Sequence, residues 1–171
     1  MNAVPNRRSA IGLALAGLAA VLVGLAGCDG ERKLVAGQHT EHDVRQVMGV
    51  PTTIWDLPDG GREWDYVRAP HGWETVRVRI GADGRYQGMR NLLTDENFAN
   101  AKPGMSLDEL TRLFGKPTDS ASYHLKPDEV VWSWRYRGLD GIKYRFNAYL
   151  DQASGRAKHF NRTDDPQERA G

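Results

Sequence analysis

An internal repeat constrains the fold of this chain more than any other feature of its sequence. Residues 40–51 and 106–117 share one pattern, position for position: a hydroxyl residue, an acidic residue three positions later, apolar residues at helical spacing, and a closing Gly-x-Pro. Downstream, the run Trp64-Asp65-Tyr66 corresponds to Trp134-Arg135-Tyr136. Self-similarity at a nearly fixed period indicates repeated supersecondary units that stack to share their packing, so we expect two copies of one unit.

Each copy opens with the signals of a short capped helix. A hydroxyl side chain at the N-cap accepts a hydrogen bond from a free backbone N–H, and an acidic residue three positions on returns the bond. A glycine then ends the helix and a nearby proline prevents it from restarting. The residues that fill these places, first copy before second, are Thr40 and Ser106, Asp43 and Glu109, Gly49 and Gly115, and Pro51 and Pro117. So short a helix needs a sheet to pack on.

The remainder of each copy has the alternation and turn residues of β-strands. The predicted strands cover 52–57, 62–67, 75–80 and 86–92 in the first copy, and 118–125, 130–136, 143–150 and 157–160 in the second. A further short helix is expected before each cap, over 31–36 and 94–101, and a frayed polar tail over 163–171. The predicted fold is α+β: two tandem repeats, each with short helices packed on a three- to four-stranded antiparallel sheet.

The N-terminal residues have the pattern of an export signal. Arg7 and Arg8 precede residues 10–27, which carry no charge, and the run ends in Leu25-Ala26-Gly27-Cys28. Small residues beside a cysteine at the end of an apolar run resemble the lipobox of bacterial lipoproteins, where cleavage precedes the cysteine and its sulfur receives the lipid. An uncleaved transmembrane anchor is the alternative, but this uncharged run is short for a span and is diluted by Gly and Ala.

The cysteine count and the charge agree with lipidation. Cys28 is the only cysteine, so acylation removes the one thiol that an oxidising compartment would leave unpaired. The whole chain has a formal charge of +1, which gives no reason to expect a nucleic-acid partner. Cleavage would remove two arginines and leave 21 basic and 22 acidic residues, a charge of −1. Lipid rather than charge would then hold the protein on the membrane.

The repeat pattern resembles the BamE (SmpA/OmlA) family of outer-membrane assembly lipoproteins. In the second copy the matching residues are Gly104-Met105-Ser106, Glu109-Leu110, Gly115-Lys116-Pro117 and Trp134-Arg135-Tyr136. The first copy departs from the family pattern at Gln38-His39, and the family's founding members have one unit where this chain has two. The resemblance implies domains at 1–27 (signal peptide), 28–97 and 98–165 (two BamE-like repeats) and 166–171 (tail).

The resemblance also implies a function and a location. Family members are accessory to the machine that inserts β-barrels into the outer membrane, so the expected partner is that machinery, and the expected role is a non-catalytic scaffold for assembly or envelope integrity. Asp29 directly after the cysteine is similar to a signal for retention in the inner membrane. The outer membrane is nevertheless favoured. The tandem arrangement is also similar to the β-lactamase inhibitory proteins, which makes a periplasmic inhibitor the alternative.

The motifs of catalysis and of cofactor binding are missing from the sequence. His39 and His42 could chelate a metal at helical spacing, but no third ligand follows in a recognised pattern, so solvated polar residues at a helix start are the simpler interpretation. The chain has no Gly-x-Ser-x-Gly turn and no glycine-rich loop that leads into a helix. We therefore expect no enzyme activity, no metal and no cofactor other than the lipid on Cys28.

The tryptophans divide into two groups by the repeat. Trp64 and Trp134 occupy matched positions, which favours a place in the two cores. Trp55, Trp73 and Trp132 have no counterpart in the other copy. Of these we expect Trp55 and Trp73 to be exposed partner contacts, since tryptophan is enriched in binding sites. Charged residues on alternate strand positions, such as Arg77, are expected on the solvated side of a sheet.

Overall fold

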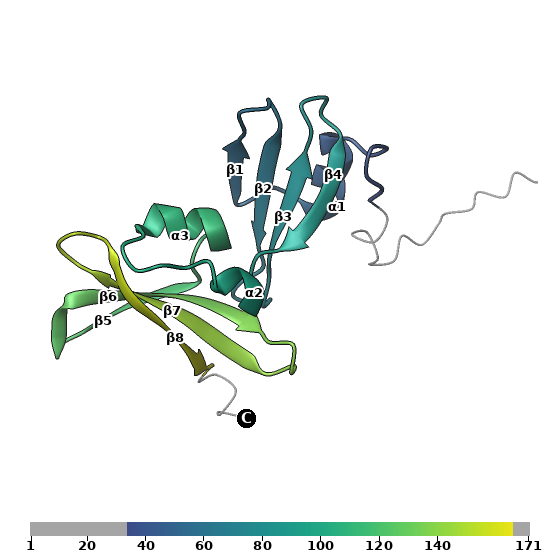
Figure 1. Cartoon of the computed structure of the whole chain (residues 1–171). Helices are drawn as coiled ribbons and strands as arrows, with labels where there is room; N and C mark the ends of the chain where they lie inside the picture. Colours follow the sequence, from purple (N-terminus) through teal and green to yellow (C-terminus); the bar gives the residue numbers. More distant parts are fainter. Residues whose placement is uncertain (1–33, 166–171) are drawn as a thin grey trace, which may run out of the picture.

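The structure is a computed structural model that describes residues 34–165, and it has an α+β architecture. The described residues form two four-stranded antiparallel sheets and three short helices (Figure 1). We call residues 34–92 the first half and residues 93–165 the second half. Each half contains a capped helix followed by four strands, as the sequence predicts, and in each half the strands pair in chain order.

The first half contains α1 (Glu41–Met48) and a meander of four strands. These are β1 (Thr53–Asp56), β2 (Arg62–Val67), β3 (Thr75–Ile80) and β4 (Tyr86–Asn91), which neighbour one another in the order β1-β2-β3-β4. A register shift between Arg79 and Ile80 of β3 marks a bulge at Gln87 of β4, which has no partner in the register. All four strands lie close to their predicted bounds.

The second half contains two helices and a longer meander. The helices are α2 (Asp95–Phe98) and α3 (Leu107–Phe114), and the strands are β5 (Asp119–Tyr123), β6 (Lys126–Arg137), β7 (Lys143–Asp151) and β8 (Ala157–Asp164). Their order in the sheet is β5-β6-β7-β8. Figure 1 shows α2 at the point where the two halves meet, with α3 over one face of this sheet.

Both predicted capping boxes are present. Thr40 Oγ1 accepts from Asp43 N–H at 3.4 Å while Thr40 N–H donates to Asp43 Oδ2 at 2.7 Å, and Ser106 and Glu109 make the equivalent pair at 3.2 and 2.8 Å. Both helices end at a glycine with positive φ, Gly49 and Gly115, a conformation that L side chains adopt only with strain. The helix starts and ends are thus set by local residues, as the sequence predicts.

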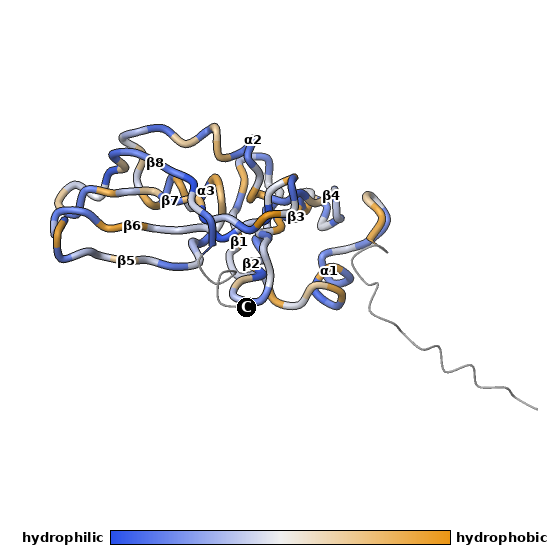
Figure 2. Tube along the Cα trace, turned by 90° about the horizontal axis from the view of Figure 1, so that it is seen from below, coloured by the Kyte–Doolittle hydropathy of each residue, from blue (hydrophilic) through white to orange (hydrophobic). Residues whose placement is uncertain are grey.

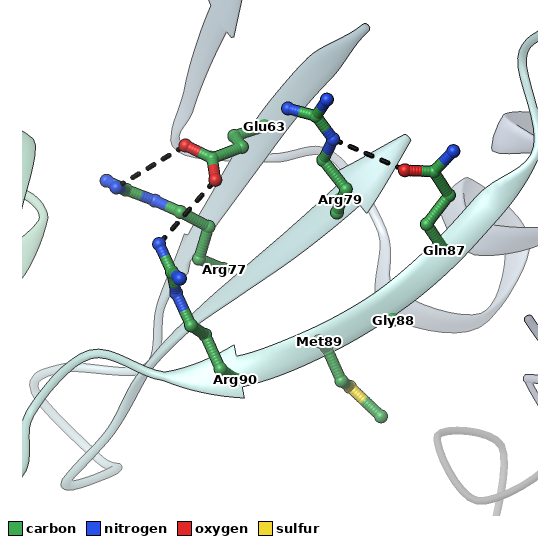
Figure 3. A pocket seen from close by; sticks show the side chains of 7 residues that line it. All are labelled: Glu63, Arg77, Arg79, Gln87, Gly88, Met89 and Arg90. Atoms are coloured by element: carbon green, nitrogen blue, oxygen red, sulfur yellow. Dashed lines mark hydrogen bonds and ion pairs between the residues drawn. The ribbon is translucent and has the colours of Figure 1, made fainter. Parts of the chain in front are cut away.

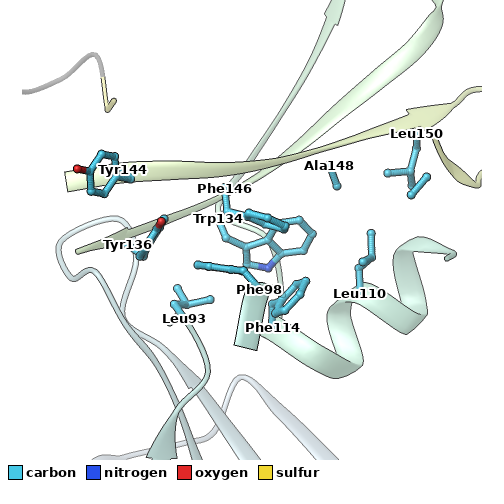
Figure 4. Packing of buried hydrophobic residues seen from close by; sticks show 11 residues of the cluster. Leu93, Phe98, Leu110, Phe114, Trp134, Tyr136, Tyr144, Phe146, Ala148 and Leu150 are labelled. Atoms are coloured by element: carbon cyan, nitrogen blue, oxygen red, sulfur yellow. The ribbon is translucent and has the colours of Figure 1, made fainter. Parts of the chain in front are cut away.

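Each half has its own apolar core. In the first half Val44 and Met48 point from α1 onto a sheet face with Trp64, and Figure 2 shows that α1 carries hydrophilic and hydrophobic residues side by side. In the second half aromatic rings dominate: Phe98, Phe114, Trp134 and Phe146 meet at the centre (Figure 4). Trp64 and Trp134 are both fully buried, which confirms their predicted core positions.

Three segments differ from the prediction. The tail prediction was wrong for residues 163–165, since β8 continues to Asp164 and Asp165 is 1% exposed. Residues 34–36 of the expected first helix are not helical, and residues 31–33 lie outside the described part of the chain. The expected boundary between residues 97 and 98 falls inside α2, because both Leu93 and Phe98 pack into the second core.

Candidate functional site

Trp55 lies at the contact between the two halves, which we call the junction. Its side chain is half-buried on β1, and its indole N–H donates to Asp65 Oδ2 at 2.8 Å. The guanidinium of Arg112, on α3 of the second half, lies 5.0 Å from the ring centroid, within cation–π range. Trp55 is half-buried and not fully exposed as expected, because its ring packs against the other half of its own chain; its role as a partner contact stays a prediction.

Trp73 also belongs to the first half, and its ring contacts the sheet of the second half. It precedes β3 and is half-buried against the second sheet, with the Arg135 guanidinium 4.2 Å and Lys143 Nζ 5.0 Å from its ring centroid. Arg135 also donates to the carbonyl of Pro70 at 3.4 Å. Trp73 is therefore not the exposed side chain that we expected. The broken repeat symmetry of both tryptophans reflects a structural role at the junction, where the two halves contribute different surfaces.

A buried ion pair underlies the junction on the first sheet. Asp65 is 0% and Arg77 4% exposed, and Arg77 Nε and Nη2 donate to the two carboxylate oxygens at 2.6 and 2.8 Å. The third guanidinium nitrogen, Nη1, donates to the carbonyl of Arg112 on α3 at 2.8 Å. The prediction that Arg77 faces solvent was wrong: α3 covers this part of the sheet face.

The carboxylate of Glu63 forms ion pairs with three arginines beside the buried Asp65–Arg77 pair. Its carboxylate lies 2.7 Å from Arg112, 3.6 Å from Arg77 and 3.6 Å from Arg90. The Glu63 side chain is 13% exposed, whereas that of Arg90 is 66% exposed. Since one carboxylate faces several guanidinium groups, Arg90 keeps much of its capacity to bind another anion.

An open pocket lies on this face beside the junction. It has a volume of about 340 Å³ and is lined by residues of β2, β3 and β4: Glu63, Arg77, Arg79, Gln87, Gly88, Met89 and Arg90. Figure 3 shows the arginines, Glu63 and Gln87 on one side of the sheet, with the side chain of Met89 directed away from them. Arg79 donates to Gln87 Oε1 at 3.3 Å and also pairs with Asp59. We call this the arginine pocket.

The second sheet carries a different surface on its side away from α3, where uncharged polar side chains lie beside the ion pairs of Arg135 and Arg145. Ser133 Oγ donates to Asn147 Oδ1 at 2.7 Å, and Asn147 Nδ2 donates to Asn161 Oδ1 and Thr163 Oγ1 at 2.9 and 3.1 Å. A pocket of about 270 Å³ lies over these residues. Because the side chains satisfy one another, this polar ladder is suited to ordering the sheet.

Buried Asp165 anchors the end of β8 to the second sheet. Its carboxylate lies 2.5 Å from Arg135 Nε and 3.4 Å from Arg145 Nε. Sequence reasoning missed both buried carboxylates, Asp165 and Asp65. The available signal was an opposite charge on the neighbouring strand, Arg77 on β3 for Asp65 and Arg145 on β7 for Asp165. The alternation of charged and apolar residues there is, however, typical of a solvated face.

Two buried tyrosines of the described residues have strongly raised pKa values. Burial raises the pKa of both Tyr66 and Tyr136 to about 12, so each remains a neutral phenol at neutral pH. His39 Nδ1 accepts from Val35 N–H at 2.9 Å, and His42 contacts Gln46. Within residues 34–165 no group of three or more His, Cys, Asp or Glu side chains could hold a metal ion.

The predicted lipidation site lies outside the described residues. Leu25, Ala26, Gly27 and Cys28 all precede residue 34, where the description begins. Over the described part of the chain, no helix is both long and apolar enough to cross a membrane.

Comparison with known proteins assigns no family to this chain. No family model and no curated protein matches it. Among solved structures, a DUF4309 family protein (YjgB) from Bacillus subtilis is similar over 78% of this chain and 84% of its own, with 13% identity and a TM-score of 0.29. A TM-score this low does not establish a common fold.

Proposed function

We propose that this chain is a non-catalytic, lipid-anchored periplasmic scaffold that supports outer-membrane β-barrel assembly or envelope integrity. The observation that carries the proposal is the pairing of a lipobox with two capped-helix units of the kind that the BamE family uses once. Exposed sheet faces and a pocket lined by arginines would suit contact with a protein more than turnover of a small substrate.

The finer proposal about the fold is that the two halves are tandem BamE-like repeats. Matched bridges support it: Thr40 pairs with Arg85 ahead of α1, and Ser106 pairs with Arg156 ahead of α3. The matched Trp64 and Trp134 support it as well, since each lies fully buried beneath its helix. The two units would then present a larger contact surface than a single unit.

The anchor is proposed to be a diacylglycerol on Cys28, on the periplasmic side and preferably of the outer membrane. Intact mass of the membrane-extracted protein tests the first part: we expect loss of residues 1–27 and gain of lipid mass, and a Cys28→Ser variant that stays unprocessed. An unlipidated chain that retains Met1 would contradict the proposal. Density fractionation tests the membrane, and recovery only with inner-membrane markers would reverse our preference.

The partner is tested by affinity purification from detergent-solubilised envelopes. The tagged chain should enrich the β-barrel insertion machinery, and the Cys28→Ser variant should lose that enrichment because it no longer shares the membrane surface with the complex. Failure of the lipidated chain to enrich the machinery would contradict the proposal.

A periplasmic inhibitor is the second candidate function. The exposed faces of both sheets favour it, since each carries a pocket lined by polar and charged side chains. In the same purification, recovery of a β-lactamase or a peptidase without the insertion machinery would support this candidate over the scaffold.

A further inference from the structure

The last strand of the first sheet has a free edge beside the arginine pocket. β4 pairs with β3 on one side only and lies at the end of the sheet. Arg90 and Gly88 are registered with Arg77 and Arg79 of β3, and Leu92 N–H donates to Thr75 C=O at 2.8 Å. Because backbone groups alternate in direction along a strand, those of Met89 and Asn91 point away from β3.

The chain itself already uses part of this edge. Tyr86 N–H donates to the carbonyl of His39 at 2.8 Å, and Gly37 N–H donates to the carbonyl of Tyr86 at 2.8 Å. The segment around Gly37–His39 therefore pairs with the start of β4 as an added strand would. It stops before the bulge at Gln87, and no described residue pairs with the edge from Met89 to Asn91.

The two faces beside this edge differ in chemistry. On the pocket side lie the guanidinium groups of Arg79 and Arg90, with Arg90 66% exposed. Across the pocket region the charges of Arg77, Arg79, Arg90 and Arg112 are opposed by those of Glu63, Asp65 and Asp59, which leaves one positive charge in excess. On the opposite side of the strand Met89 is 41% exposed, although it is registered with the buried Val78.

We propose that the edge of β4 from Met89 to Asn91 binds an extended segment of another protein, in which acidic and apolar side chains alternate. Its backbone would pair with Met89 and Asn91 and extend the sheet by one strand. Its acidic side chains would reach the arginine pocket, and its apolar side chains would cover Met89, because neighbouring residues on a strand point to opposite faces. The proposal stands apart from the proposed function, since it specifies the chemistry of the segment and not the complex that supplies it.

The test uses defined peptides and the purified chain in detergent. A short capped peptide of alternating glutamate and valine should bind, and a matched peptide of lysine and valine should bind about tenfold more weakly. Methylating the backbone nitrogens of every second residue should weaken binding about tenfold in one register and leave it unchanged in the other, because only alternate N–H groups face the edge. Equal binding of the two methylated forms would overturn strand addition.

A charge reversal on the exposed side chain provides the protein-side test. Arg90→Glu should weaken binding of the glutamate peptide about tenfold and strengthen binding of the lysine peptide. Arg137→Glu, an equal charge change on the exposed end of β6, should leave both affinities unchanged. If Arg137→Glu matched Arg90→Glu, or if the glutamate peptide failed to bind the unaltered chain, the proposal would be wrong.

Discussion

The two halves of the molecule have the same plan but different interiors. The core of the second half has a ring cluster in which Phe98 stacks on Phe146 at 4.2 Å and meets Phe114 at 5.1 Å. Over residues 34–92, the core of the first half contains no phenylalanine and combines aliphatic residues with Trp64 and two tyrosines, Tyr66 and Tyr86. The difference extends to hydrogen bonding: Trp134 Nε1 donates to the carbonyl of Gly115 at 2.8 Å, but Trp64 Nε1 is buried with no acceptor among the described residues. A repeated motif thus preserves the position of a side chain without preserving its partners.

The largest expected loss of stability follows from removing a buried carboxylate, and the two sheets should differ in how much they lose. Asp65→Ala would remove the carboxylate that pairs with Arg77, which is 4% exposed, and should lower the free energy of unfolding by about 3–5 kcal/mol. Asp165→Ala should cost somewhat less: its nearer partner Arg135 is 7% exposed, but its second partner Arg145 is 19% exposed and water can solvate that guanidinium. Urea unfolding of the purified variants measures both. The double change Asp65→Leu with Arg77→Met removes both charges and should cost far less than Asp65→Ala alone; an equal cost would mean that the ion pair is not the cause.

The next comparison uses matched apolar residues of the two helices. Val44 and Leu110 correspond in the repeat, and both are 0% exposed. Leu110→Ala should cost about 2–5 kcal/mol from lost burial and the remaining cavity, and Val44→Ala about 2 kcal/mol because fewer carbons are removed. Each variant should unfold in one transition, since the junction couples the halves. Two separated transitions, with each variant moving only its own, would show that the halves unfold independently.

The matched tryptophans test the hydrogen-bond difference directly. Trp134→Phe leaves the Gly115 carbonyl without its donor, whereas Trp64→Phe removes an N–H that has no acceptor among the described residues. Both changes lose a similar amount of ring, so Trp134→Phe should be the more destabilising by about 1–3 kcal/mol, the cost of an unsatisfied buried group. Thermal unfolding ranks the two. Equal losses would indicate that Trp64 finds an acceptor after all.

Sequence and structure agree where local signals decide and differ where long-range contacts decide. The caps at Thr40 and Ser106 and the strand alternation need only nearby residues, so these elements were predicted closely. The environment of Trp55 depends on Arg112, which belongs to the other half of the chain, and no local pattern contains that pairing. In the same way Asp165 looked like part of a polar tail, because its partner Arg135 lies on another strand.

The candidate site could be predicted only in part. Trp55 and Trp73 lie outside both cores, but Trp132, which is equally unmatched in the repeat, packs against the second core. The repeat alone could not tell an external contact from a contact between halves. The free edge of β4 follows from the order of strands in the sheet, which the sequence leaves open. The lipobox at Cys28 stays a prediction.

The smallest expected effect is the stability that the two capping boxes lose at acidic pH. The backbone N–H of Ser106 bonds to Glu109 and lowers the pKa of its carboxyl below the usual 4.5, and Thr40 does the same for Asp43 relative to 3.8. A lowered folded-state pKa gives stabilisation that is present above the unfolded value and is lost as pH falls through the folded value. The stability advantage over Glu109→Gln should therefore shrink as pH falls below about 4.5. The stability advantage of the unaltered chain over Asp43→Asn should disappear at a lower pH than its advantage over Glu109→Gln. A stability difference that does not change with pH would show that these carboxylates do not stabilise the caps through their charge.

The junction also determines how many units this architecture can join. The first sheet offers Trp55 and Glu63 to the helix of the unit that follows, which makes the contact head-to-tail, and such a contact generates an open filament if every unit repeats it. When Trp64 is aligned with Trp134, however, Ser133 stands where the first sheet has Glu63, and Arg135 stands where it has Asp65. The second sheet therefore lacks the carboxylates that receive Arg112 and Arg77 in the first. A third unit with the same helix would therefore meet a serine and an arginine in place of the two carboxylates, so this contact is specific to the first sheet and the helix that follows it.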